Sequence, residues 1–259
     1  MRFREIFRFE FMYQVRRVRT WLYVAILFVV AYQLRDGAAN SPFAIAQETI
    51  LTDFVWILTA AAVAGTAAAR DVQTRMHPLV YTTPISKAEY LGGRFLAAFV
   101  LNALILLAVP LAMLANLAFP RLEPVIVAPF RPAVYISSYG VLAVSTAFIF
   151  TAVQFSLAAL TRRPMVSYLG IVLMFVAGGL PAALAVNVLR MPTLGTLLDP
   201  TTRIPVLIIM ADTFTPLQMN TVVIGLEPSI LANRMLWIAL ACAVLAFTHV
   251  RFRVGDREG

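Results

Sequence analysis

Long apolar runs alternate with short polar intervals along this chain, and most of the runs approach the length of a membrane crossing. In hydrocarbon every backbone N–H and C=O must be satisfied within its own segment, so separate runs of about 20 apolar residues indicate transmembrane helices. The runs do not show the period-two alternation that a membrane barrel needs. We therefore expect an all-α membrane protein with six transmembrane helices, at residues 21–39, 47–69, 92–119, 133–160, 166–189 and 234–250.

The first 20 residues are amphipathic rather than uniformly apolar. One helical face is shared by apolar residues at every third or fourth position, namely Phe3, Phe7, Phe11, Val15 and Val18. Other faces carry most of the arginines, namely Arg4, Arg8, Arg16, Arg17 and Arg19. The pattern predicts an amphipathic interfacial helix over residues 1–20, with its rings in the acyl boundary and its guanidiniums among headgroups, and a six-span domain over residues 21–259. A solvated basic helix is the alternative, but the many aromatic residues argue against it.

Local signals predict where several helices begin or bend. Ser41-Pro42 is typical of a helix N-cap followed by proline at the first helical position, so the second span should begin there. Pro110 predicts a kink inside the third span, because proline removes a backbone hydrogen bond. Gly178-Gly179 with Pro181 predicts a distorted fifth span that permits close helix contact.

Two acidic residues, Glu48 and Asp53, fall in the first turns of the second span. An ionisable residue within a membrane helix is a candidate proton relay. Because both residues lie near the outer end of the span, we expect them instead to be solvated in the headgroup region.

Two intervals between the later spans are polar or interrupted by proline. Residues 120–132 contain several prolines and are predicted to form a non-helical loop. Residues 190–233 contain charged residues, including Asp199, Arg203, Asp212 and Glu227, around apolar pieces too short to span. We expect an external region there, with one or two short or re-entrant helices between the fifth and sixth spans.

Composition supports the membrane assignment and excludes other classes of site. Of the 259 residues, 61% are hydrophobic and 13% are charged, which lies well outside the soluble norm. The single cysteine, Cys242, excludes an internal disulfide and a cysteine-based metal cluster. The two histidines, His77 and His249, are far apart and match no zinc motif.

The distribution of the 21 basic residues predicts the orientation of the chain. If six spans place both termini on one side, the opposite side receives only Arg35, Arg121, Arg131, Arg190, Arg203 and Arg234. Because cytoplasmic loops carry the excess of Lys and Arg, both termini and the 70–95 interval are expected in the cytoplasm. Topology thereby accounts for the net charge of +8, and we expect no nucleic-acid partner.

The sequence contains no phosphate-binding loop of the form G-x-x-x-x-G-K-[ST] and no peptidase motif. We therefore expect no enzymatic activity in this chain, and no catalytic, cofactor-binding or metal-binding residues. Any work that the protein performs must draw on a partner or on an ion gradient.

The most informative polar interval is residues 70–95, between the second and third spans. Pro78 and Pro84 bracket a short apolar piece, and we expect a short helix between Met76 and Thr83. Ser86 and Glu89 have the spacing of a capping box, which would start the next helix rigidly. A helix held by prolines between two spans would transmit force, although an ordinary cytoplasmic connector is an open alternative.

This interval resembles the coupling segment of type-2 ATP-binding-cassette (ABC-2 type) transporter permeases. Its sequence from Arg70 to Phe95 is R-D-x-x-T-R-M-H-P-L-V-Y-T-T-P-I-S-K-A-E-Y-L-G-G-R-F. In that family an acidic residue after the second span is followed by a short helix, T-P-[VI]-S-[RK] and a helix into the third span. Asp71 stands where the family usually has glutamate, and Thr74-Arg75-Met76 replaces its glycine-threonine-leucine.

The later part of the chain resembles the permease halves of one branch of that family, in which they are fused to a gluzincin aminopeptidase. The similarity is carried by Asp199-Pro200, Thr215-Pro216, Asn220 and Asn233-Arg234-Met235-Leu236-Trp237. The basic aromatic opening before Trp21 also resembles the family's amphipathic connecting helix. The chain therefore resembles one six-span permease half.

The resemblance implies a transmembrane subunit of an ATP-driven exporter in the bacterial cytoplasmic (inner) membrane. It implies a cytoplasmic coupling helix between the second and third spans, a separate cytoplasmic ABC ATPase subunit that binds ATP and Mg²⁺, and a second permease half in a homodimer or heterodimer. The residues that it implies for contact with the ATPase are Asp71, His77, Leu79, Tyr81, Thr83, Pro84 and Glu89.

Two other functions remain open. An ion-gradient-driven secondary carrier would use Glu48 or Asp53, but no inverted repeat or buried charge pair is evident to support it. A non-transporting membrane scaffold would bind a partner and move no solute.

Overall fold

The computed structural model describes residues 2–34, 38–74, 85–119, 126–127 and 129–252. Within them, five helical segments are long and apolar enough to cross a membrane, and a sixth is added if the first two helices form one bent span. The five are Pro42–Val72, Lys87–Ala118, Pro132–Thr161, Pro164–Asn187 and Pro228–Arg251. The chain thus has the helical, apolar architecture of a multi-pass membrane protein.

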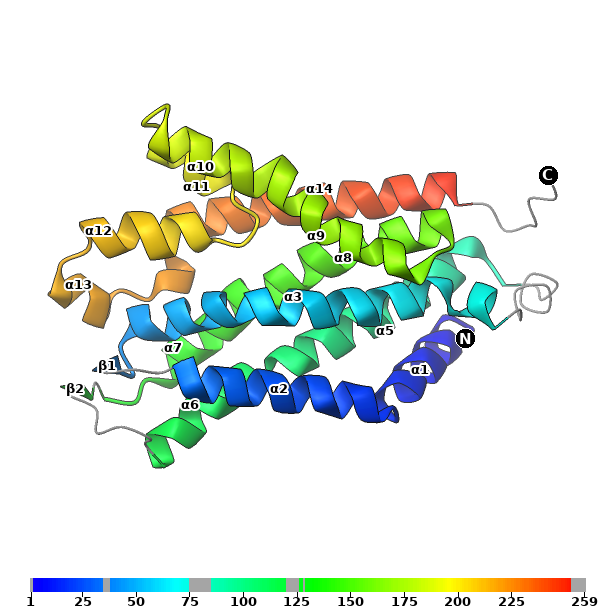
Figure 1. The fold of residues 1–259 in the computed structure, drawn as a ribbon, viewed down its shortest axis with the longest axis horizontal. Coiled ribbons are helices and arrows are strands. Elements are labelled where there is room, and N and C mark those ends of the chain that lie inside the picture. Colours follow the sequence, from blue (N-terminus) through cyan, green and yellow to red (C-terminus); the bar gives the residue numbers. More distant parts are fainter. Residues whose placement is uncertain (1, 35–37, 75–84, 120–125, 128, 253–259) are drawn as a thin grey trace.

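The longer elements run side by side along the long axis of the molecule (Figure 1). The α-helices are α1 (Arg2–Val15), α2 (Val18–Leu34), α3 (Pro42–Gln73), α5 (Lys87–Leu106), α6 (Ala108–Ala118), α7 (Pro132–Ser137), α8 (Val144–Thr161), α9 (Leu169–Met174), α10 (Leu180–Asn187), α11 (Pro192–Leu198), α12 (Ala211–Thr213), α13 (Pro216–Thr221) and α14 (Pro228–Arg251). The π-helical segments are η1 (Ser138–Ala143), η3 (Phe175–Gly179) and η4 (Ile204–Met210), and the 3-10 segments are η2 (Pro164–Tyr168) and η5 (Ile224–Leu226). The short strands β1 (Ala38–Ala39) and β2 (Ile126–Val127) pair in parallel.

Helix α3 lies in the middle of the bundle and packs against α2, α5 and α8. Its fully buried Trp56 donates through Nε1 to the carbonyl of Asn102 at 3.1 Å, and the Asn102 amide donates to the Thr151 hydroxyl at 2.9 Å. The Trp56 and Asn102 side chains therefore gain partners on neighbouring helices, which compensates the removal of these donors from water.

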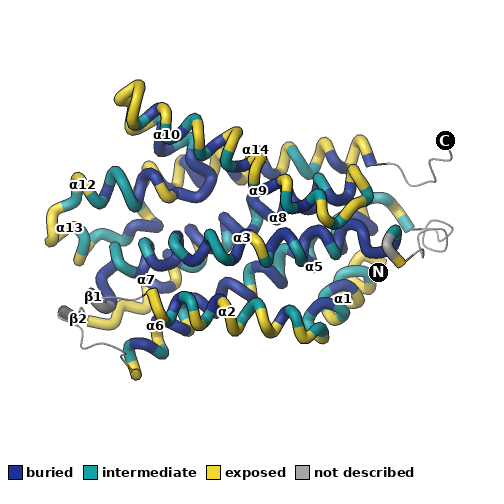
Figure 2. Tube along the Cα trace, viewed as in Figure 1, coloured by how far each residue is buried: buried dark blue, intermediate teal, exposed yellow. Residues whose placement is uncertain are grey.

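The outer helices are much less covered than the centre. In the apolar window of the span containing α8, 78% of residues are buried, compared with 22% for α14. Figure 2 shows the contrast between the dark centre and the exposed residues on α10 and α14. The exposed side chains include Leu180, Leu184 and Leu240, so lipid or another apolar surface must cover these faces.

Several local predictions are confirmed. The Ser41 hydroxyl accepts from the Ala44 N–H at 3.1 Å with proline following. The third span breaks at Leu107, three residues before Pro110, between α5 and α6. Such a break is expected because the proline ring clashes with the preceding turn.

The glycine prediction in the fifth span is also confirmed. The span is interrupted by η3, and a Cβ atom at Gly178 would lie 2.7 Å from the Pro200 Cδ and 3.0 Å from Trp237. Only a residue without a side chain permits this approach of the fifth span to the segment after α11.

The structure differs from the predicted orientation of α1. Phe11 and Val15 pack against the helical core, whereas Val18 is 83% exposed. The polar Glu10 and Gln14 are buried. Helix α1 lies against α5 and meets α2 at 67°, so its predicted apolar face belongs largely to the protein interior.

The acidic residues of the second span are also placed differently from expectation. Glu48 and Asp53 are 7% and 1% exposed, so solvation in the headgroup region was the wrong prediction. Hydropathy locates a residue along a span but does not show which helices surround it. The absence of buried charge pairs was wrong too, because two such pairs lie beneath α1.

The intervals between the spans are partly described. Residues 190–233 form α11, η4 with α12, α13 and η5, which confirms short helices and gives more of them than expected. The pairing of Ile126–Val127 adds a short strand to the predicted loop at 120–132. The helix predicted between Met76 and Thr83 lies outside the described residues.

Candidate functional site

The two ends of the 75–84 interval lie at one end of the molecule. Helix α3 ends there with the Thr74 N–H donating to the Arg70 carbonyl at 2.8 Å. Helix α5 begins nearby with the predicted capping box, in which Ser86 Oγ accepts from the Glu89 N–H and Glu89 Oε2 accepts from the Ser86 N–H. The N-terminus and the end of α14 lie at the same end (Figure 1).

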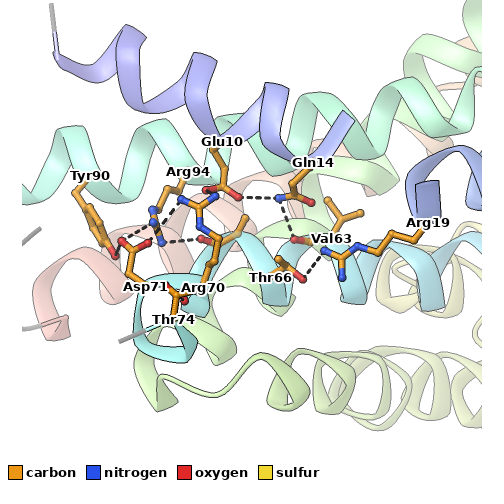
Figure 3. A network of polar contacts seen from close by, with 11 residues as sticks. Glu10, Gln14, Arg19, Val63, Thr66, Arg70, Asp71, Thr74, Tyr90 and Arg94 are labelled. Atoms are coloured by element: carbon orange, nitrogen blue, oxygen red, sulfur yellow. Dashed lines mark hydrogen bonds and ion pairs between the residues drawn. The ribbon is translucent and has the colours of Figure 1, made fainter. Parts of the chain in front are cut away.

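Asp71, in the last turn of α3, joins that helix to α5 (Figure 3). Its Oδ2 lies 2.5 Å from Arg94 Nη2 and accepts from the Tyr90 hydroxyl at 3.2 Å. Arg94 also donates to the Ala67 carbonyl at 3.0 Å, and its guanidinium lies over the Tyr90 ring at 4.6 Å. The ends of two adjacent spans are therefore joined by a buried ion pair that has a further hydrogen bond on each side.

Arg70, the neighbour of Asp71, extends the network to α1. Its Nη1 lies 2.8 Å from Glu10 Oε2, and its guanidinium lies over the rings of Phe9 and Tyr13 at 5.0 and 4.5 Å. Because Arg70 also approaches Asp71 at 3.6 Å, the two ion pairs form one network. We call Glu10, Arg70, Asp71, Tyr90 and Arg94 the ionic junction.

Two further contacts join α3 to the first two helices, one from α1 and one from α2. Gln14 donates to Glu10 Oε1 at 3.1 Å and to the Val63 carbonyl at 3.5 Å. Arg19, just after the bend, donates to the Thr66 hydroxyl at 3.1 Å. Figure 3 shows these contacts continuing along α3 from the ionic junction, so α3 is bonded to both α1 and the start of α2.

The charges of the ionic junction balance, with two carboxylates opposite two guanidiniums. Burial raises the pKa of the Glu10 carboxyl above its ordinary value, and the Arg94 and Arg70 guanidiniums oppose that effect. A buried pair contributes little net stability, but removing one member leaves an uncompensated charge. Such a junction therefore specifies one arrangement of helices more than it strengthens the fold.

A partly open cavity of about 420 Å³ adjoins the ionic junction. It is lined by charged and aromatic residues that include Phe9, Glu10, Tyr13, Arg70 and Arg94. Water can therefore reach the edge of the junction, while its central ion pair stays buried.

The predicted ATPase-contact residues are only partly described. Asp71 is 5% exposed and belongs to the ionic junction, so it could act only through its neighbours. Glu89 is at the capping box and partly exposed. His77, Leu79, Tyr81, Thr83 and Pro84 lie outside the described residues, and their roles stay predictions.

The sequence did not predict that Glu10, Arg70, Tyr90 and Arg94 belong to one site. Arg94 was counted as a cytoplasmic surface charge, yet it is 3% exposed. A charge just inside an apolar span, opposite an acid at the end of the preceding span, was the available signal. Among the described residues, no group of three or more His, Cys, Asp or Glu is placed to hold a metal ion.

No protein-family model matches the sequence, and no curated protein matches it.

Proposed function

We propose that this chain is the transmembrane permease subunit of an ATP-driven ABC transporter, an exporter, coupled to a separate ATPase subunit through residues 70–90. The observation that carries the proposal is the ionic junction, which joins α1, the end of α3 and the start of α5 on both sides of the interval that resembles a coupling segment. A displacement of that interval would move α1, α3 and α5 together.

The ends of the interval are suited to transmit such a push. The capping box fixes the first turn of α5, and Tyr90 in this turn donates to Asp71 in the last turn of α3. Lys87 donates to the Val250 carbonyl at 3.1 Å, and Tyr90 stacks on Phe252 with ring centroids 6.0 Å apart. The end of α14 is thereby included, so movement at the cytoplasmic end would extend to the last span.

The exposed apolar faces support a second permease half. Helix α14 and the span from η2 to α10 are the least buried of the five long segments. In the proposed assembly one of these faces contacts a second half, as a homodimer or heterodimer, and the remainder faces the lipid bilayer. ATP and Mg²⁺ would bind to the partner ATPase, and both termini would be cytoplasmic in a bacterial inner membrane.

The test is reconstitution with the ATPase that co-purifies from native membranes. The chain should raise the rate of ATP hydrolysis by that subunit. Glu89→Gln removes a charge while glutamine keeps a capping-box partner, and it should lower the stimulation. The matched control is Asp212→Asn, because Asp212 is an exposed acid on α12, at the opposite end of the molecule in Figure 1.

Equal stimulation by the two variants would contradict contact at the 70–90 interval. Transport by the purified chain on an ion gradient, without any ATPase, would favour the carrier instead. The burial of Asp53 is the observation that keeps the carrier as a second candidate. Binding of a partner without movement of any solute would indicate a scaffold.

A further inference from the structure

Asp53 lies on α3, far from the ionic junction. The 17 residues that separate it from Arg70 correspond to about 25 Å along the helix axis. Its side chain is 1% exposed, and neither carboxylate oxygen has a hydrogen-bond partner of good geometry within the described part of the chain. An ionised carboxylate in this position would have lost its water and gained little beyond the nearby Thr146 side chain, which is a costly state.

The polar groups that act on Asp53 come from two other helices, Thr146 of α8 and Arg234 of α14. Arg234 is itself engaged elsewhere. It donates to the Pro200 carbonyl at 2.9 Å, to the Thr146 hydroxyl at 3.2 Å and to the Asn233 side chain. These bonds occupy the guanidinium, and no ion pair between Arg234 and Asp53 is found within the described part of the chain.

Two acidic side chains act on the charge of Arg234, and the effect of Asp199 is larger than that of Asp53. Asp199 accepts from the Thr201 N–H at 2.9 Å, the Thr201 hydroxyl at 2.7 Å and the Ile204 N–H at 2.6 Å. These three donors replace the water that the buried Asp199 carboxylate has lost. Asp199 and Arg234 therefore balance each other, and Asp53 would add a surplus negative charge.

The remaining charged groups nearby do not change this balance. Glu48 lies on the same helix and is also acidic. Arg203 is exposed and lies over the ring of Phe54, 5.8 Å from its centroid. A metal cation does not fit, because Arg234 repels it and no set of three acidic or histidine ligands exists among the described residues. The group that neutralises Asp53 is then a proton.

We propose that Asp53 is a proton-binding site at the junction of α3, α8 and α14. In the arrangement described here the carboxyl group is protonated and neutral. When α14 moves and water enters, the O–H bond breaks, the proton passes to a water molecule and the carboxylate becomes hydrated. Protonation therefore favours the packed arrangement, and rising pH favours its opening.

The experiment compares thermal unfolding of the purified chain in detergent across pH for wild type, Asp53→Asn and Asp212→Asn. Asparagine resembles a neutral carboxyl group in shape, so Asp53→Asn should fold and be at least as stable as wild type at neutral pH. The loss of stability that wild type and Asp212→Asn show as pH rises should be smaller in Asp53→Asn. A variant that fails to fold, or that is destabilised at every pH, would overturn the proposal, because a neutral isostere should be tolerated at a carboxyl group that is already neutral.

Infrared absorption gives a second measurement that does not depend on stability. The C=O band of a protonated carboxyl group should be present at neutral pH in wild type and in Glu48→Gln. It should be lost in Asp53→Asn. If the wild-type spectrum instead differs from that of Asp53→Asn by carboxylate bands, Asp53 is ionised in the folded chain and the proposal is wrong.

Discussion

Replacing Asp71 by asparagine tests the ionic junction most directly. The substitution keeps the shape of the side chain and removes its charge, which leaves Arg94 and Arg70 opposite Glu10 alone. Arg94 is 3% exposed and keeps only its bond to the Ala67 carbonyl at 3.0 Å. One positive charge is then uncompensated in the interior.

The size of the effect follows from that imbalance. Breaking a buried ion pair by removing one partner costs about 3–5 kcal/mol. Glu10 still lies near both guanidiniums, so we expect the lower end, about 3 kcal/mol. This corresponds to roughly a hundredfold change in the folded-to-unfolded ratio. For a chain of this length it lowers the melting temperature by about 6–12 °C.

The assay is thermal unfolding in detergent, analysed as a double-mutant cycle of Asp71→Asn and Arg94→Met. We expect the double variant to lose far less stability than the sum of the losses in the two single variants, since the double variant leaves no unpaired charge between residues 71 and 94. Asp212→Asn is the control for loss of an exposed acid. If Asp71→Asn shifts the melting temperature no more than this control does, the buried pair does not exist as described.

Three further substitutions test other parts of the structure. In the folded chain burial raises the pKa of Glu10 above its ordinary value of 4.5. The stability that protonated Glu10 contributes is therefore full below the ordinary value and is lost as pH rises through the raised pKa. In a series of unfolding temperatures measured across pH, Glu10→Gln should remove this pH-dependent contribution. A Cβ atom at Gly65 would clash with the Pro164 backbone oxygen of η2, so Gly65→Ala should lower stability by about 1–3 kcal/mol. Gly140 is the control, because a Cβ atom there would have nothing within 4 Å and Gly140→Ala should cause no overpacking. Equal melting temperatures for the two variants would contradict the close approach at Gly65. Asn233 donates to three carbonyls at the end of α11, so Asn233→Ala should lower stability by about 1–3 kcal/mol in denaturation assays, while Asn187→Ala, at an exposed position, should change it little.

Features that depend on a few neighbouring residues could be predicted from the sequence. The capping box at Ser86 and the break before Pro110 each involve a single turn of helix. The lengths of the apolar runs likewise predicted the positions of the long helices, because the cost of unsatisfied backbone groups acts within each segment.

The pairings within the candidate site could not be predicted in this way. Glu10 meets Arg70 across 60 positions of sequence, and neither residue type distinguishes a buried partner from a surface charge. Asp53 shows the same limit, because its burial depends on α8 and α14. Which side of α1 faces the protein was missed since both of its sides carry aromatic residues.

The bend that turns α1 away from α2 leaves α2 with only 17 residues, about 25 Å of helix. The hydrocarbon layer of a typical bilayer is about 30 Å thick. The outward side of α2 exposes Trp21, Leu22 and Val29, so acyl chains must contact it directly. We therefore expect the bilayer to be locally thinner beside this helix. Lipids with shorter acyl chains would match this thickness with the least elastic deformation of the membrane.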